Sequence, residues 1–144
     1  MKTYIADTSF WIGLCYDNDA YRHDSIKLYE NIQDNSKIIL PWPSMYETLR
    51  TKFVRNYNAL KRFEKELKRT NVIKYGDRQI RNSALTELFE MNLRHGRQLS
   101  LTDCMIRQII CNGTKLNGLI TSNKSDFLEI CAPRRVEIYE LTTP

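Results

Sequence analysis

Four acidic residues stand next to apolar runs in this chain: Asp7, Glu47, Asp103 and Asp126. Asp7 follows "YIA", Glu47 lies in "PSMYETL", Asp103 lies in "LSLTDCMIRQII", and Asp126 comes after "LNGLITS". Hard divalent cations such as Mg²⁺ and Mn²⁺ prefer oxygen ligands, which converging carboxylates supply. An ion held in this way activates water and neutralises a phosphodiester under attack. The four acids therefore support the hypothesis of a metal-dependent phosphodiesterase site.

Asp7 and Glu47 each have a simpler interpretation. Asp7 is suited to be the N-cap of a helix that begins at Thr8, a role that contributes about 1 kcal/mol and that Thr8 or Ser9 can also fill. Glu47 lies on a helix whose apolar stripe is formed by residues 45, 49 and 53, and it points away from that stripe. An exposed helix glutamate fits this placement, although Val54 on the same face makes that face only partly polar.

Asp103 combines a capping pattern with an apolar environment. Ser100 and Asp103 have the S-x-x-D form of a capping box. Asp103, Ile106 and Ile110 are also spaced i, i+3, i+7, which places the carboxylate on the apolar face of its helix. A buried carboxylate needs a cation or hydrogen-bond donors, so here the site interpretation is favoured. Asp126 fits a short helix capped just upstream and a site residue equally well.

Strand and helix patterns alternate along the chain. We expect strands at 3–6, 37–41, 118–121 and 135–141, with a brief strand or an extended connector at 71–75. Helices are expected from Thr8 and at 24–33, 43–56, 58–69, 78–94, 100–112 and 124–131, with Gly96 and Gly113 as stop signals. This alternation predicts a largely parallel sheet covered on both faces. Ligands of such sheets bind at the carboxyl ends of the strands, where Asp7 and "TSNKSD" are expected.

Positive charge is concentrated in one segment. The chain carries a net charge of +5, and "RTKFVRNYNALKRFEKELKR" at 50–69 holds eight basic and two acidic residues. A solvated helix face is the simpler explanation. A phosphate-binding surface is favoured only if a phosphate-cleaving site lies nearby. The candidate RNA-binding residues are Arg50, Lys52, Arg55, Lys61 and Lys65.

Bulk properties narrow the class of protein. A length of 144 residues suits one domain, 1–144, with one buried core. No apolar run approaches the roughly 20 residues of a membrane span, and the chain starts in a strand pattern, so we expect a cytoplasmic protein without membrane contact. The four cysteines form no C-x-x-C pair and are expected as buried thiols. No Walker-type loop, G-x-G-x-x-G or G-x-S-x-G occurs, which disfavours nucleotide-cofactor enzymes and serine hydrolases.

Taken in order, "YIADTSFWIGL", "PSMYETL", "LSLTDCMIRQI" and "GLITSNKSDF" resemble the motifs of the PIN-domain ribonucleases, in particular the VapC-type toxins of toxin–antitoxin pairs. The resemblance covers residue 3 to about residue 140. It implies an α/β fold, a PIN-like three-layer sandwich with a largely parallel central sheet flanked by helices. It also implies Mg²⁺- or Mn²⁺-dependent cleavage of single-stranded or structured RNA, with tRNA among the targets.

The resemblance also implies roles for individual residues. Asp7, Glu47, Asp103 and Asp126 match the catalytic acids by position. Asp7, Asp103 and Asp126 would hold the metal, and Glu47 would bind it or position the attacking water. Hydrolysis would proceed by attack of water on phosphorus, with the 3′ oxygen leaving.

One position departs from the pattern of the family. Many members have T-x-D-x-D-F where this chain has "TSNKSDF", so Asn123 replaces the first acid. Asn123 and Ser9 are therefore auxiliary candidates. Because asparagine brings no charge, one tightly held ion, with a second recruited by RNA, is the expected arrangement. A family toxin would also bind a small antitoxin and form a homodimer.

Three other functions remain open. An RNA-maturation nuclease of the same fold would have the same acids. A catalytically silent PIN-like module that binds RNA or protein is mildly favoured by Asn123, and the four retained acids argue against it. A receiver-type or phosphatase-type domain with Asp7 as phospho-acceptor is least favoured, because "IADTSF" lacks a second nearby acid.

Overall fold

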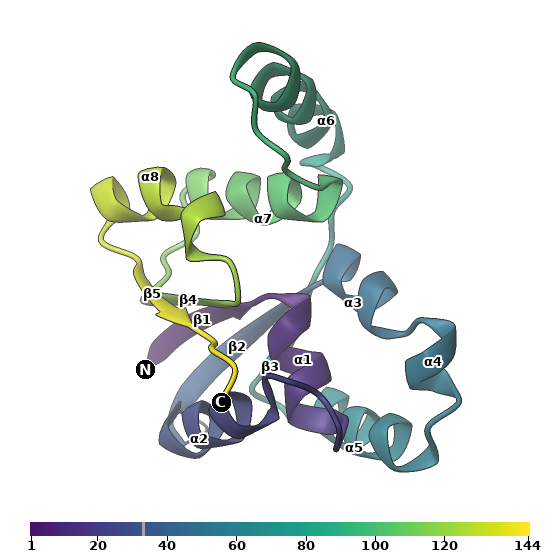
Figure 1. Cartoon of the computed structure of the whole chain (residues 1–144). Coiled ribbons are helices and arrows are strands. Elements are labelled where there is room, and N and C mark those ends of the chain that lie inside the picture. The colour runs from purple at the N-terminus through teal and green to yellow at the C-terminus, as the bar shows by residue number, and fades with distance from the viewer. Residues whose placement is uncertain (33) are drawn as a thin grey trace.

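The computed structural model describes residues 1–32 and 34–144. Its centre is a parallel five-stranded sheet with the order β3-β2-β1-β4-β5 (Figure 1). The strands are β1 Lys2–Ala6, β2 Ser36–Pro41, β3 Val72–Tyr75, β4 Gly118–Thr121 and β5 Glu137–Glu140. The α-helices are α1 Thr8–Cys15, α2 Arg22–Ile32, α3 Trp42–Thr48, α4 Thr51–Val54, α5 Tyr57–Leu67, α6 Arg81–Phe89, α7 Leu101–Cys111 and α8 Leu128–Cys131. Short helical turns are η1 Glu90–Arg94, η2 Lys124–Asp126 and η3 Ala132–Arg134.

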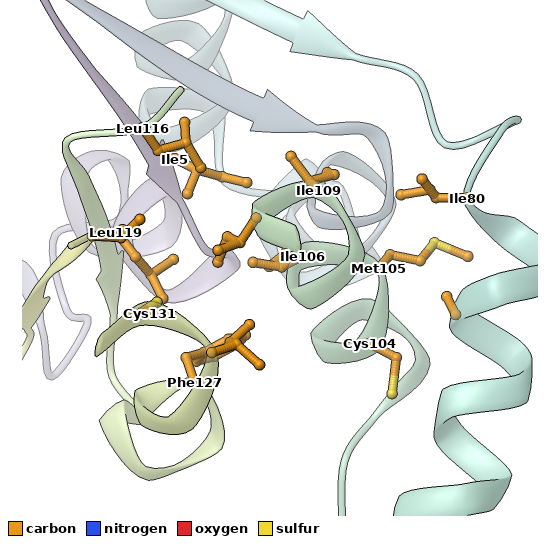
Figure 2. Packing of buried hydrophobic residues seen from close by; sticks show 14 of the residues in the cluster. Ile5, Ile80, Cys104, Met105, Ile106, Ile109, Leu116, Leu119, Phe127 and Cys131 are labelled. Carbon is orange, nitrogen blue, oxygen red and sulfur yellow. The ribbon is translucent and has the colours of Figure 1, made fainter. Parts of the chain in front are cut away.

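The central strands are apolar on both faces because helices cover both sides of the sheet. Ile5, Ile39 and Leu119 face a cluster built with α6, α7 and α8, part of which Figure 2 shows. Phe127 and Ile106 are fully buried in that cluster. The predicted three-layer α/β fold with a parallel sheet is confirmed.

The opposite face of the sheet packs on α1 to α5. Alternate strand residues such as Tyr4 and Ile38 point to this side, where Trp11 and Phe63 are fully buried. Trp11 and Phe63 meet edge to face with centroids 6.1 Å apart. Aromatic pairs of this geometry add to the stabilisation that burial gives. The first helix after β1 is thus fixed firmly against the sheet.

The strand order places a topological switch point at the middle of the sheet. β1 pairs with β2 on one side and with β4 on the other. The crossovers leaving β1 and β4 therefore diverge, and the crevice at their carboxyl ends is where open α/β sheets bind ligands. Asp7 directly follows β1, and Ser122 and Asn123 directly follow β4.

Several predicted helices differ from the structure. The helix expected at 43–56 is two helices, because α3 ends at Thr48 and α4 begins at Thr51. The predicted stripe of Met45, Leu49 and Phe53 is therefore wrong: Leu49 is exposed, while Phe53 turns inward to pack edge to face on Phe63.

The helix expected at 78–94 begins at Arg81 and finishes as the π-helical turn η1. Gly96 and Gly113 have φ of +65° and +82°, so both stop signals are confirmed. The helix expected at 24–33 begins at Arg22, and its predicted end at Gln33 lies outside the described residues. The predicted helix at 124–131 is interrupted at Phe127, between η2 and α8.

The structure also bears on the predictions about the cysteines and about membrane spans. Three of the four free cysteines are buried, and Cys111 is half-buried. Among the helices of the described residues, none has the length and apolar character needed to cross a membrane.

Candidate active site

Asp7 is the centre of the candidate site. Its backbone N–H donates to the carbonyl of Ile120 at 2.9 Å, which holds it beside the end of β4. Its Oδ1 accepts from the backbone N–H of Thr8 at 2.6 Å, and its Oδ2 accepts from the hydroxyl of Thr121 at 3.0 Å. The capping interpretation is therefore confirmed, and Asp7 itself is the N-cap of α1.

The environment of Asp7 disfavours its negative charge. Removal from water is the main reason that the pKa of Asp7 rises to about 6, and the charges of Asp103 and Glu47 act in the same direction. The hydrogen bonds from Thr8 and Thr121 oppose this rise without cancelling it. A helix cap alone does not require other acids nearby, so capping is an incomplete account of Asp7.

Glu47 reaches the site from α3. Its Oε1 accepts from the hydroxyl of Thr8 at 2.7 Å, so Thr8 links Glu47 to the neighbouring Asp7. Glu47 also borders an open pocket of about 220 Å³. The apolar part of this pocket includes Ile12 and Phe53, and its polar lining includes residues 18, 19, 50 and 52. Glu47 is therefore not an isolated surface glutamate.

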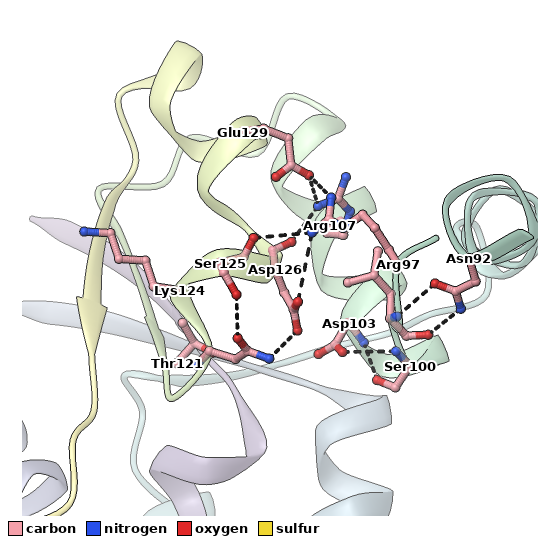
Figure 3. Close-up of polar contacts among 12 residues, drawn as sticks. Asn92, Arg97, Ser100, Asp103, Arg107, Thr121, Lys124, Ser125, Asp126 and Glu129 are labelled. Atoms are coloured by element: carbon pink, nitrogen blue, oxygen red, sulfur yellow. Dashed lines mark hydrogen bonds and ion pairs between the residues drawn. The ribbon is translucent and has the colours of Figure 1, made fainter. Parts of the chain in front are cut away.

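Asp103 is held at the start of α7 by a complete capping box. Its backbone N–H donates to the hydroxyl of Ser100 at 3.0 Å, and its Oδ2 accepts from the backbone N–H of Ser100 at 3.1 Å (Figure 3). The predicted capping pattern is confirmed. The side chain is half-buried, and its charge acts on both Asp7 and Asp126. Asp103 is thus an electrostatic neighbour both of Asp7, which follows β1, and of Asp126 in η2.

Asp126 is held by the loop after β4. The side-chain amide of Asn123 donates to its Oδ2 at 2.5 Å, and the hydroxyl of Ser125 donates to the amide oxygen of Asn123 at 3.0 Å (Figure 3). The backbone N–H of Asn123 donates to the hydroxyl of Thr121 at 3.1 Å, the same hydroxyl that contacts Asp7. Asn123 therefore orders this loop, and its side chain makes no N-cap bond.

Two arginines fix Asp126 from the side of α7. Arg107 is only 2% exposed, and it donates to the backbone carbonyl of Asp126 at 2.6 Å. It also pairs with Glu87 of α6 and Glu129 of α8. Arg97 pairs with Glu129 at 2.6 Å and lies 4.0 Å from Oδ1 of Asp126. Burial and the charge of Asp103 raise the pKa of Asp126, while these arginines and Asn123 lower it.

The donor chemistry of the site fits a hard divalent cation. In the described part of the chain, no basic side chain forms an ion pair with Asp7, Glu47 or Asp103. The hydroxyl oxygen of Ser9, two residues after Asp7, is buried without a hydrogen-bond partner. Uncompensated carboxylates and an unpaired buried oxygen are the groups that a cation or its water would satisfy.

The acids do not form a closed set of ligands as they stand. Among residues 1–32 and 34–144, no three His, Cys, Asp or Glu side chains converge on one ion position. The Oδ2 atoms of Asp103 and Asp126 are engaged by Ser100 and Asn123. The ligand set Asp7, Asp103 and Asp126 therefore stays a prediction, and binding an ion would require these carboxylates to turn toward it.

Four of the predicted RNA-binding residues divide into two groups, and the fifth, Arg55, directly follows α4 as its C-cap. All five are exposed, and Arg50 and Lys52 line the pocket that Glu47 borders. Lys61 and Lys65 lie on α5, where Lys61 stands 5.9 Å from the ring centroid of Tyr57 and lines a separate pocket. The structure thus brings Arg50 and Lys52 to the candidate site.

Four residues of the site have roles that the sequence analysis missed. Thr8 and Thr121 lie inside the recognised motifs, next to or just after apolar strands, so their position was a usable signal. Arg97 and Arg107 gave no such signal, because their acidic partners lie 19 to 32 residues away along the chain.

Comparison with known proteins supports the fold. No protein-family model and no curated protein matches this chain. The structure of VapC20 from Mycobacterium tuberculosis, described as a sarcin-ricin loop cleaving toxin, is similar with a TM-score of 0.65 and 17% identity, over 81% of this chain and 86% of that chain. The structure of VapBC2 from Rickettsia felis bound to a promoter DNA fragment is similar with a TM-score of 0.58 and 12% identity, over 96% and 98% of the two chains. The resemblance to VapC proteins is thus confirmed for the fold.

Proposed function

We propose that this chain is a divalent-cation-dependent endoribonuclease and the toxin of a toxin–antitoxin pair. The observation that carries the proposal is the group of four acids at the switch point of the sheet. The negative charges of Asp103 and Glu47 act on Asp7, and the negative charge of Asp103 also acts on Asp126. A VapC-like fold around these acids favours phosphodiester hydrolysis over the other chemistries of acid clusters.

Each acid has a proposed role. Asp7, Asp103 and Asp126 hold the cation, Mg²⁺ or Mn²⁺, whose chemistry is the polarisation of a phosphoryl oxygen and the activation of water. Glu47 is oriented by the hydroxyl of Thr8 and accepts a proton from the attacking water or positions it. Asn123 keeps the carboxylate of Asp126 in place without adding charge.

The substrate and partners follow from charge and from the similar structures. Arg50 and Lys52 beside Glu47 favour a polyanionic substrate that passes the acids. VapC20 is described as cleaving the sarcin-ricin loop, which supports a single-stranded or structured RNA as the substrate of this chain. The candidate substrates include tRNA. The VapBC2 structure supports a small antitoxin as protein partner. We also propose that the chain forms a homodimer and acts in the cytoplasm.

RNA cleavage tests the proposal. Wild type, Asp7→Asn and Glu47→Gln would be incubated with labelled single-stranded RNA and with total tRNA, in Mg²⁺, in Mn²⁺ and in EDTA. Glu30→Gln, on the exposed surface of α2, is the matched control. We expect cleavage by wild type and Glu30→Gln with metal only. If Asp7→Asn cleaves RNA as well as wild type does, Asp7 is only a helix cap. If wild type cleaves RNA in EDTA, the reaction does not depend on a divalent cation.

A further inference from the structure

Two aromatic side chains are exposed on α3, the helix that carries Glu47. Trp42 is 38% exposed and Tyr46 is 66% exposed. They are one helical turn apart, and their ring centroids lie 5.9 Å apart with the ring planes at 45°. Neither ring belongs to the two core clusters, so core packing does not account for them.

The aromatic pair lies next to the proposed site. β2 pairs with β1 so that Ile39 stands opposite Ile5. The two strands therefore end side by side, β2 at Pro41 and β1 at Ala6, directly before Asp7. Trp42 follows Pro41 directly. Tyr46 directly precedes Glu47, whose carboxylate contacts Thr8 beside Asp7. The helix that supplies an acid to the site thus also supplies two exposed rings.

Basic side chains lie on the segments of chain next to the aromatic pair. The exposed Arg81, at the start of α6, forms an ion pair with Asp77 at 3.1 Å, and Tyr46 is among the groups that act on its charge. Arg50 and Lys52 follow on the same stretch of chain and line the pocket that Glu47 borders. Exposed rings together with basic side chains match a strand that carries both planar bases and phosphates, because aromatic faces stack on bases while basic side chains follow the backbone.

We propose that Trp42 and Tyr46 form a stacking platform for an unpaired base of the RNA strand whose phosphodiester lies at the four acids. This inference rests on the proposed ribonuclease function. A base within a duplex is already stacked and paired, so the platform favours single-stranded or looped RNA over duplex. Stacking on an aromatic ring accepts any base, so the platform selects unpaired structure rather than sequence.

Tryptophan fluorescence tests the platform independently of cleavage. The chain has two tryptophans, and Trp11 is fully buried, so a response to RNA reports Trp42. The full chain carrying Asp7→Asn keeps the RNA intact during titration with single-stranded oligoadenylate, an abasic oligomer of the same length, and an RNA duplex. We expect strong quenching by oligoadenylate and little by the other two. Equal quenching by the abasic oligomer would overturn the proposal.

Variants separate stacking from charge. In the same background, Tyr46→Leu should weaken the affinity for oligoadenylate by about 5- to 160-fold, the range that corresponds to one lost stacked base. Trp42→Phe should remove the fluorescence response. Phe89→Leu, at a phenylalanine 49% exposed at the end of α6, is the matched control and should bind like the background protein. Equal affinity of Tyr46→Leu and the control would overturn the platform, provided that thermal melting shows both folded.

The two proposals fail in different ways. If wild type cleaves RNA and Trp42 does not respond to oligoadenylate, the platform is wrong and the nuclease stands. If wild type cleaves no RNA and Trp42 responds to bases, RNA binding at α3 stands and the nuclease is wrong. If the fluorescence changes with protein concentration in the absence of RNA, this face associates with a second copy of the chain, and the platform is wrong.

Discussion

Replacing Asp7 with asparagine should make the protein more stable while it removes the proposed activity. The carboxylate of Asp7 is held near Asp103 and Glu47, and its pKa is raised to about 6. Asparagine is close in shape, and its side-chain oxygen can still accept the hydrogen bond from Thr8 that caps α1. The substitution therefore removes an unfavourable charge and keeps the cap.

The raised pKa sets the size and the pH range of the effect. The pKa rises from 3.8 to about 6, and one pKa unit corresponds to about 1.36 kcal/mol, so full ionisation of Asp7 lowers the free energy of unfolding by at most about 3 kcal/mol. Because solvent still reaches part of the Asp7 side chain, we expect its ionisation to lower the free energy of unfolding by about 2 kcal/mol. Because the native pKa lies above the unfolded value, the penalty from Asp7 is absent below about pH 4 and is complete once the pH has risen through about 6.

Urea denaturation of wild type and Asp7→Asn measures this difference. Without divalent cations, the variant should exceed wild type by about 2 kcal/mol at about pH 7.5 and match it at about pH 4. Mg²⁺ or Mn²⁺ should stabilise wild type at the higher pH and leave the variant unchanged. Asp34→Asn, at an exposed turn, is the control for removing one charge and should follow wild type at both pH values.

A lower stability of Asp7→Asn at about pH 7.5 would refute this reasoning. It would mean that the negative charge of Asp7 stabilises the N-terminus of α1 more than the neighbouring acids destabilise it. A pH-independent difference would show that the substitution acts through packing rather than through charge.

Three further predictions follow from the supporting residues. Arg107→Ala should lower the free energy of unfolding by about 3 kcal/mol in urea, because it leaves Glu87 and the backbone carbonyl of Asp126 without their buried partner, while Glu129 keeps Arg97. Unchanged stability would show that the contacts of Arg107 contribute nothing. Ser100→Ala should lose about 1 kcal/mol of stability, because it removes a capping hydroxyl, and should still cleave RNA. Asp103→Asn should keep most of its stability and lose cleavage. Equal cleavage by the two variants would show that Asp103 is only a cap. Substituting Arg50 and Lys52 together by alanine should reduce the slope of log affinity against log salt for single-stranded RNA by about 1.4, and an unchanged slope would place the backbone elsewhere.

Much of the fold was readable from the sequence because local signals agreed with each other. The apolar run at 4–6, the S-x-x-D pattern at Ser100 and the stop signals at Gly96 and Gly113 each depend on neighbouring residues only. The break between α3 and α4 was not readable in this way. Phe53 packs on Phe63, ten residues further along the chain, and that tertiary contact overrides the helical pattern.

The site was predicted only in part for the same reason. The four acids stand at recognisable positions, and the electrostatic neighbours of Asp7 confirm that Asp103 and Glu47 lie near it. The supports of Asp126 come from remote segments: Arg107 is fixed by Glu87 on α6 and Glu129 on α8. An arginine within an apolar helix gives no sign of which acids surround it. Whether the acids bind a cation depends on side-chain directions that spacing does not encode.

Calorimetric titration of Mn²⁺ into the full chain at neutral pH measures ion binding by the four acids without any RNA target. We expect that wild type binds a single ion, that Asp7→Asn and Asp103→Asn lose this binding, and that the surface control Glu30→Gln retains it. Equal binding by wild type and both site variants, or no binding by any of them, would contradict this expectation and leave these acids as helix caps.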